Sequence, residues 1–66
     1  MYLPRLRDMR EDHDLKQTEI AELLGIQQTV YSRYERGART IPLEHLVKLA
    51  EFYKVSVDFL LEHRKP

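Results

Sequence analysis

LKQTEIAELLGIQQTVYSRYERG, residues 15–37, contains two short amphipathic segments separated by Gly25. Apolar side chains recur at helical spacing in both segments. They are Ile20, Leu23 and Leu24 in the first segment and Val30, Tyr31 and Tyr34 in the second. Glycine adopts positive φ at little cost, so Gly25 predicts the end of the first helix and Gly37 the end of the second. The stretch therefore predicts helices over residues 17–24 and 28–36, which together form a helix-turn-helix.

Three more helices are predicted outside this stretch, over residues 4–13, 43–53 and 57–63. Pro4 suits a first helical turn, and Pro42 marks the fourth helix, with Thr40 or Ile41 expected as its cap. Ser56 is expected to cap the fifth helix, and Asp14 either caps the second helix or closes the turn before it. The apolar stripe expected on the fourth helix consists of Leu43, Leu46, Val47, Leu49, Ala50 and Tyr53. Without sustained period-two alternation, the chain is expected to be all-α.

Composition points to one small cytoplasmic domain spanning residues 1–66. The absence of cysteine excludes disulfides, thiolate zinc sites and thiol catalysis. The chain has no apolar run long enough for a membrane span and no signal peptide at its start, so we expect no membrane partner. The net charge is zero, but the three cations and one anion between Gln27 and Ile41 give that segment a charge of +2. Such a basic edge suits contact with phosphate groups.

The polar face of the predicted third helix has the composition of a DNA-reading surface. This face carries Gln28, Thr29, Ser32, Arg33 and Arg36. A major groove admits one α-helix, in which glutamine can bond adenine and arginine can bond guanine. Gln17 and Thr18 begin the preceding helix, where exposed N–H groups and the helix dipole favour a phosphate. We therefore expect double-stranded DNA as the partner.

The chain resembles the Xre-type, Cro and phage-repressor (lambda-repressor-like) helix-turn-helix family. The resemblance rests on LxQxxIAxLLGI, QQTVYSRYERG and Pro42, and it resumes as LVKLAEFYKVSVDFLL at residues 46–61. It implies a compact five-helix domain whose third helix reads bases. Carried over by position, the resemblance implies a phosphate contact at Gln17, base contacts at Gln28, Thr29 and Arg33, and a backbone contact at Arg39. It also implies a buried structural ion pair between Arg10 and Glu35.

Three residues depart from the family pattern. Gln27 stands where serine or threonine usually caps the third helix, and glutamine caps poorly, which predicts either lower local stability or a Gln27 side chain redirected to a phosphate. Tyr31 replaces a core aliphatic residue, so its hydroxyl needs a partner. Lys54 stands where glycine or asparagine often ends the fourth helix.

The polar and charged residues also have other interpretations. The Gln, Thr and Arg face alone also fits a solvated helix surface. His13, His45 and His63 do not have metal-ligand spacing, so neither a metal nor a cofactor is expected. The acidic run over residues 11–14 has no nucleophile or metal to serve, so no enzymatic activity and no catalytic residue are expected.

The functional hypothesis is a sequence-specific transcriptional regulator, a repressor that binds an inverted-repeat operator as a homodimer. The alternative is an antitoxin or another protein-interaction module built on the same fold, with a protein partner. Phe52 lies away from the main stripe of the fourth helix. It is either a partly exposed aromatic or, with Phe59 and Leu61, a dimer contact.

Overall fold

Five α-helices follow one another along residues 1–62, the part of the chain that the computed structural model describes. They are α1 (Pro4–Asp12), α2 (Gln17–Leu24), α3 (Gln28–Arg36), α4 (Leu43–Tyr53) and α5 (Val57–Leu60), and no strand occurs within that range. The all-α, five-helix prediction is confirmed. The helix expected over residues 57–63 ends at Leu60, and residue 63 lies outside the described residues.

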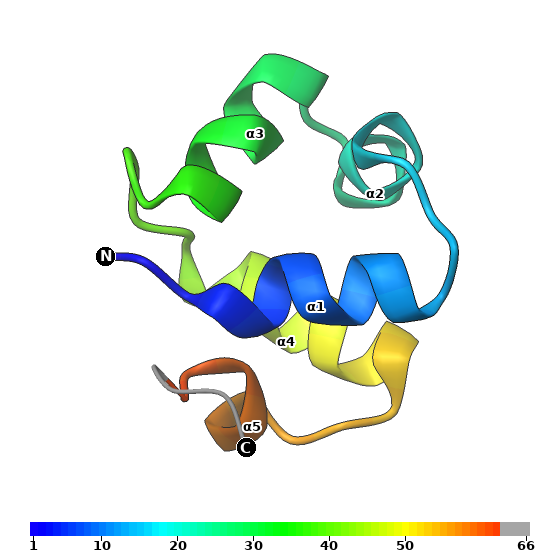
Figure 1. Cartoon of the computed structure of the whole chain (residues 1–66), viewed down its shortest axis with the longest axis vertical. Coiled ribbons are helices and arrows are strands. Elements are labelled where there is room, and N and C mark those ends of the chain that lie inside the picture. The colour runs from blue at the N-terminus through cyan, green and yellow to red at the C-terminus, as the bar shows by residue number, and fades with distance from the viewer. Residues whose placement is uncertain (63–66) are drawn as a thin grey trace.

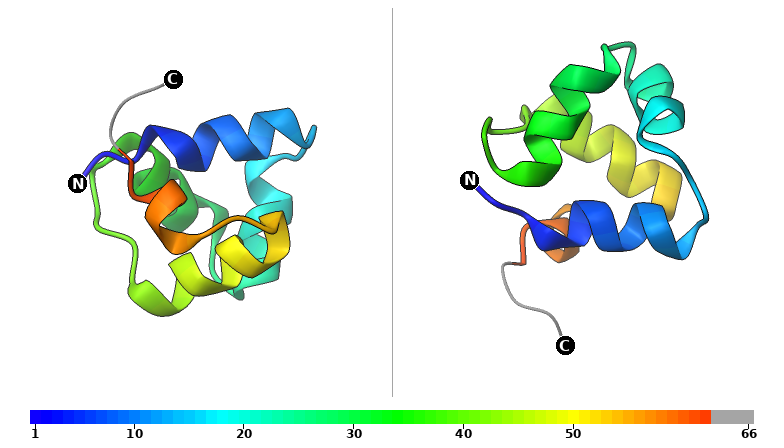
Figure 2. Two further views of the ribbon diagram at one scale, coloured as in Figure 1. Left: turned by 90° about the horizontal axis from the view of Figure 1, so that it is seen from below. Right: turned by 45° about the horizontal axis from the view of Figure 1, so that its top comes forward.

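In the view of Figure 1, α1 lies in front of α4, with α2 and α3 above α1 and α5 below it. α2 packs against α3, α4 packs against α5, and α1 contacts both α3 and α5. Seen from below, α1 and α4 form opposite sides of the molecule, with α5 beside them (Figure 2). The two helices of the helix-turn-helix therefore rest on a base made by α1, α4 and α5.

The core draws apolar side chains from all five helices and from the loops between them. Its buried members are Leu3, Leu6, Ile20, Ala21, Leu24, Tyr31, Tyr34, Ile41, Leu46, Leu49, Ala50, Tyr53 and Leu60. Each large side chain buried in this way contributes about 1.5–3 kcal/mol relative to exposure. This core holds α3 from behind.

Positive φ angles end three of the helices. Gly25 (φ 70°) follows α2 and Gly37 (φ 76°) follows α3, as the sequence predicts. Gly37 is also needed for space, because a Cβ there would lie 2.9 Å from the Cβ of Tyr2. Lys54 ends α4 at φ 60°, so a lysine adopts the left-handed conformation that glycine or asparagine usually supplies. The N-terminal segment thus lies against the end of α3.

The caps differ in part from the sequence expectations. Ser56 caps α5, since its hydroxyl accepts a hydrogen bond from the Phe59 N–H at 3.0 Å, as expected. The expectation for α4 was wrong: Pro42 itself is the N-cap, with extended backbone angles, and neither Thr40 nor Ile41 fills that position. Asp14 closes the turn after α1 at φ 56°.

The cap of α2 is Lys16. The Glu19 carboxylate accepts its backbone N–H at 3.0 Å. This is half of a capping box, since a lysine side chain has no acceptor with which to complete it.

The apolar stripe of α4 is narrower than predicted. Leu43 is 66% exposed and Val47 40% exposed, so both lie outside the core. The helix buries the side that carries Leu46, Leu49, Ala50 and Tyr53. Leu43 and Val47 are four residues apart and share the outer edge of the stripe, which no other described element covers.

Candidate nucleic-acid interface

α3 has one buried face and one exposed polar face. Tyr31, Tyr34 and Glu35 are buried. The outward positions are Gln28, Thr29, Arg33 and Arg36, which are exposed, and Ser32, which is half-buried. A helix fixed in this way can lie in a groove of DNA without losing its own packing.

The first turn of α3 leaves its cap side chain available. Gln27 is the N-cap, but its side chain makes no cap hydrogen bond and is exposed. This agrees with the poor capping ability of glutamine. The exposed amide of Gln27 therefore leaves the first N–H groups of α3 without a side-chain cap.

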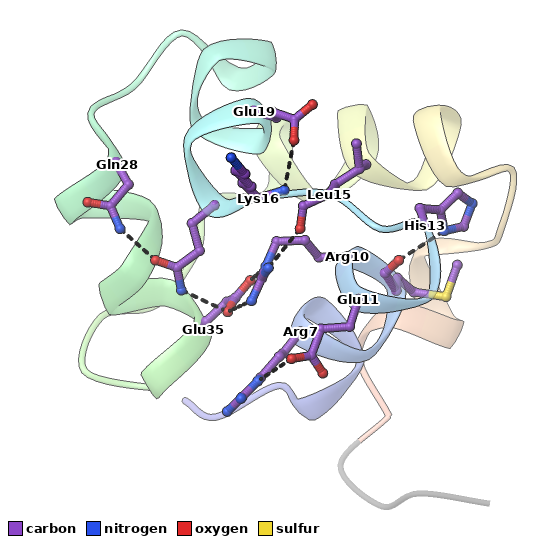
Figure 3. Close-up of polar contacts among 11 residues, drawn as sticks. Arg7, Arg10, Glu11, His13, Leu15, Lys16, Glu19, Gln28 and Glu35 are labelled. Atoms are coloured by element: carbon purple, nitrogen blue, oxygen red, sulfur yellow. Dashed lines mark hydrogen bonds and ion pairs between the residues drawn. The ribbon is translucent and has the colours of Figure 1, made fainter.

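The predicted ion pair between Arg10 and Glu35 is present and joins α1 to α3 (Figure 3). Nε of Arg10 donates to Oε2 of Glu35 at 2.6 Å, and Nη2 donates to Oε1 at 3.2 Å. Nη1 donates to the Leu15 carbonyl at 2.8 Å. Side-chain exposure is 13% for Arg10 and 3% for Glu35. The pair thus fixes the end of α3 on α1 and holds the chain that leads into α2.

A chain of hydrogen bonds continues from this pair to the start of α3. The Gln17 amide nitrogen donates to Glu35 at 3.0 Å, and the Gln28 amide nitrogen donates to the Gln17 amide oxygen at 2.6 Å (Figure 3). The sequence analysis assigned separate roles to Gln17 and Gln28, but in the structure the two side chains are joined by a hydrogen bond. No local sequence signal identifies this link, because its partners are 11 to 18 residues apart.

The surroundings of Glu35 favour its charged carboxylate form. Burial alone would raise the pKa of Glu35, but hydrogen bonds and the charge of Arg10 outweigh burial and hold the pKa below its ordinary value. The bond to Glu35 raises the pKa of Arg10. Burial, followed by the nearby charge of Glu35, raises the pKa of Tyr31 and raises that of Tyr53 to about 12.

The Tyr31 hydroxyl does not gain the partner that the sequence led us to expect, and the buried Tyr53 hydroxyl is in the same position among the described residues. Within the described residues, neither the Tyr31 nor the Tyr53 hydroxyl has a hydrogen-bond partner of acceptable geometry. The Tyr31 phenol faces the Glu35 carboxylate, whose charge acts on its pKa. Both phenols therefore stay neutral at ordinary pH.

The arginines divide into paired and unpaired sets. Arg5, Arg7 and Arg10 of α1 each pair with a glutamate. Arg33, Arg36 and Arg39 form no ion pair with any residue between 1 and 62, and all three are exposed. The Arg39 backbone N–H donates to the Arg33 carbonyl at 3.3 Å, so the loop after α3 folds back onto the helix. Positive charge is therefore left unbalanced on the exposed side of α3.

The remaining predicted residues fall in different places. Thr18 is exposed at the start of α2, beside Gln17. Phe52 is 44% exposed and borders a shallow groove with Leu15, Ile20 and Leu23.

The two other candidate dimer contacts lie elsewhere. Phe59 lies under the Arg5 guanidinium, 4.2 Å from ring centroid to Cζ. Phe59 and Leu61 are partly buried against the core. Phe52 thus borders α2, whereas Phe59 borders α1.

No group of three or more His, Cys, Asp or Glu side chains between residues 1 and 62 is arranged to hold a metal ion. No helix in that range is long and apolar enough to cross a bilayer. His63 lies outside the described residues.

Comparison with known proteins identifies one family. The helix-turn-helix family matches residues 6–60. The uncharacterized HTH-type transcriptional regulator YobD of Bacillus subtilis is 44% identical over 61 residues, covering 92% of this chain and 54% of its own length. The cryptic phage CTXphi transcriptional repressor RstR of Vibrio cholerae is 39% identical over 61 residues, covering 92% and 55%. This chain thus spans about half the length of these relatives.

A solved DNA complex has the same arrangement of helices. It is the crystal structure of SinR, the master regulator for biofilm formation, in complex with DNA. It superposes with a TM-score of 0.75 at 30% identity, over 88% of this chain and 94% of that chain. The five-helix architecture described above is therefore one that occurs bound to DNA.

Proposed function

This chain belongs to the helix-turn-helix family, and on that basis we propose that it is a sequence-specific DNA-binding transcriptional regulator. One observation carries the proposal. α3 is fixed from behind by buried Tyr31, Tyr34 and Glu35, while its outer face carries exposed polar side chains and arginines that form no ion pair with residues 1–62. An interaction module that does not read DNA has no need of such a face.

α3 would lie in the major groove and read base edges. Gln28, Thr29 and Arg33 have the donors and acceptors for this role, with Ser32 between them. Gln17 would hold Gln28 in place through the bond at 2.6 Å. A second set would contact the phosphate backbone and position the helix: Gln17, Thr18, Gln27, Arg36 and Arg39.

The regulator would act as a repressor that binds an inverted repeat as a dimer. RstR, a relative at 39% identity, is named a transcriptional repressor. Two-fold symmetric binding would place a pair of α3 helices about one DNA turn apart. Phe52, Phe59 and Leu61 remain the proposed dimer contacts, and Phe52 is the most exposed of the three. Sedimentation of the protein with and without operator DNA would measure the assembly.

Selection of bound sequences from a random duplex pool, at low and near-physiological salt, tests the function. A sequence reader would recover a motif that survives the higher salt, and a dimer would recover it as an inverted repeat. Recovery of no motif, with binding lost as salt rises, would mean electrostatic contact alone and would contradict the proposal. Under the same proposal the protein would act in the cytoplasm, where its DNA is. It would need no catalytic residue, metal or cofactor.

A second function, as an antitoxin or another protein-interaction module, is favoured by the apolar side chains exposed on α4. Leu43 (66%) and Val47 (40%) lie one helical turn apart on α4 and are both exposed, as is Phe52 (44%). A protein partner that copurifies with the wild type and is lost in a Leu43→Ser, Val47→Ser variant would support it. DNA selection on that same variant separates the two functions, because α3 is unchanged in it.

A further inference from the structure

An apolar groove with acidic edges lies between α2 and the C-terminal end of α4. Its lining consists of Leu15, Glu19, Ile20, Glu22, Leu23 and Phe52, none of which is a proposed DNA contact. We propose that this groove docks a basic amphipathic helix of a partner protein. Leucine side chains of that helix would lie against Phe52, and its lysines or arginines would lie beside Glu19 and Glu22. This inference goes beyond DNA reading.

The floor of the groove is apolar surface that no described helix covers. α2 packs against α3, and α4 packs against α5. Ile20 is buried beneath the groove, whereas Leu15 and Leu23 are only partly buried against the core. Both walls are helices, and residues 1–62 contain no strand edge to which an extended peptide could add. A helix that lays its apolar face into the groove is therefore the fitting occupant.

Phe52 is a well-supported wall of the groove. It is 44% exposed, and its ring meets the Tyr53 ring edge-on, with 5.2 Å between the ring centroids. Tyr53 is buried, and its ring centroid lies 5.0 Å from that of His13. Phe52 thus rests on an aromatic cluster that is part of the core. An aromatic side chain that is already held in place loses little conformational entropy on binding, which suits it to anchor an interface.

The edges of the groove carry negative charge that the protein does not neutralise. Glu22 is exposed and forms no ion pair among residues 1–62. Glu19 accepts the backbone N–H of Lys16, a bond that leaves its charge in place. Among the described residues, no cation lines the groove. Acidic edges beside an apolar floor favour a partner with basic residues beside an apolar stripe, and they disfavour DNA and anionic lipid.

A second copy of this chain fits the groove less well than a different protein does. A two-fold contact through the groove places the same surface on both sides of the interface. Glu19 and Glu22 of one copy would then face the same glutamates of the other, and like charges across an interface oppose binding. The charge pattern therefore favours a different protein over a dimer as the occupant beside Phe52.

The probe for this site is a fluorescein-labelled peptide of about 20 residues, long enough to form a helix, with leucines on one face and lysines beside them. Two control peptides replace its lysines by glutamates or its leucines by serines. Fluorescence anisotropy measures binding to the wild type. The probe should bind about tenfold more tightly than either control peptide, because each control lacks one half of the match. No binding of the probe, or equal binding of all three peptides, would overturn the proposal.

Variants of the protein locate the bound probe. Phe52→Ala should weaken binding about tenfold, and Glu22→Lys about fivefold. The matched controls are Val47→Ala and Glu44→Lys, which change an exposed apolar residue and an exposed acid of α4 outside the groove. Both controls should stay within about twofold of the wild type, since exposed charges away from the contact are screened by salt. Circular dichroism checks that each variant is folded.

Equal losses in the groove variants and in their controls would overturn the groove as the site. If Phe52→Ala does not fold, Glu22→Lys decides, because it changes only an exposed side chain of α2. Sedimentation of the wild type without the probe tests the other occupant. A dimer that Glu22→Lys or Phe52→Ala abolishes would assign the groove to a second copy and overturn the proposal. None of these measurements contains DNA, so their outcome does not depend on whether the chain reads DNA.

Discussion

Replacing Arg10 by methionine would leave the Glu35 carboxylate buried without its charge partner. Arg10 donates to both oxygens of a carboxylate whose side chain is only 3% exposed. The Gln17 amide would remain at 3.0 Å, but a neutral donor stabilises an anion less than a guanidinium does. Breaking one side of such a buried pair costs about 3–5 kcal/mol.

That cost is large compared with the stability of the whole domain. A chain of this length has a free energy of unfolding of about 3–10 kcal/mol. We therefore expect Arg10→Met to be unfolded in part at 25 °C, or to melt at least about 12 °C below the wild type. The double variant Arg10→Met, Glu35→Leu should recover most of the loss, because apolar residues that replace both partners leave no charge stranded.

The assay is urea unfolding followed by circular dichroism for the wild type, both single variants and the double variant. The pH dependence adds a second readout. The pKa of Glu35 is lowered in the folded state, so the pair's contribution is full above the unfolded value of about 4.3 and is lost as the pH falls through the folded value. The wild type should therefore lose more stability in acid than the double variant does. A loss below about 1 kcal/mol for Arg10→Met, or a double variant as unstable as the sum of the singles, would refute the reasoning.

Three further predictions concern the helix ends and the proposed reading face. Gly25→Ala should lower the free energy of unfolding by about 1–2 kcal/mol, because Gly25 has positive φ. Gly37→Ala should lower it by more, because Gly37 also has positive φ and its new Cβ would meet the atoms of Tyr2. Urea unfolding of the two variants compares these losses. Ser56→Ala should lower the free energy of unfolding by about 1 kcal/mol, because it removes the cap of α5. Gln27→Ser should raise it by about 0.5–1 kcal/mol by capping α3. A shift of opposite sign in either variant's melting temperature would count against the capping argument. Arg33→Ala should cost about 1–3 kcal/mol in DNA binding and relax preference at one base pair if Arg33 reads guanine; uniform weakening in a binding assay on mutated operators would make Arg33 a phosphate contact instead.

The helices of the helix-turn-helix could be placed from the sequence because their signals are local. The apolar spacing of residues 17–24 and 28–36 and the glycines after them suffice to set both helices, and the structure has the same bounds. Ser56 is recognisable as a cap for the same reason, since its partner is three residues away. Caps that make no side-chain hydrogen bond are harder to predict from the sequence, and Pro42 was not anticipated as the cap of α4.

The sequence by itself thus determined the helices, their turns and the polar face of α3, since each depends on contacts within about one helical turn. Only the tertiary structure decided which side chains work together. It joined Gln28 to Gln17 and Glu35, and it put Phe52 beside Leu23 across a shared groove. It also left Leu43 and Val47 exposed although both fit an apolar stripe. The physical reason is the same in each case: these outcomes depend on how helices distant in the chain pack against one another, and helical periodicity does not encode that packing.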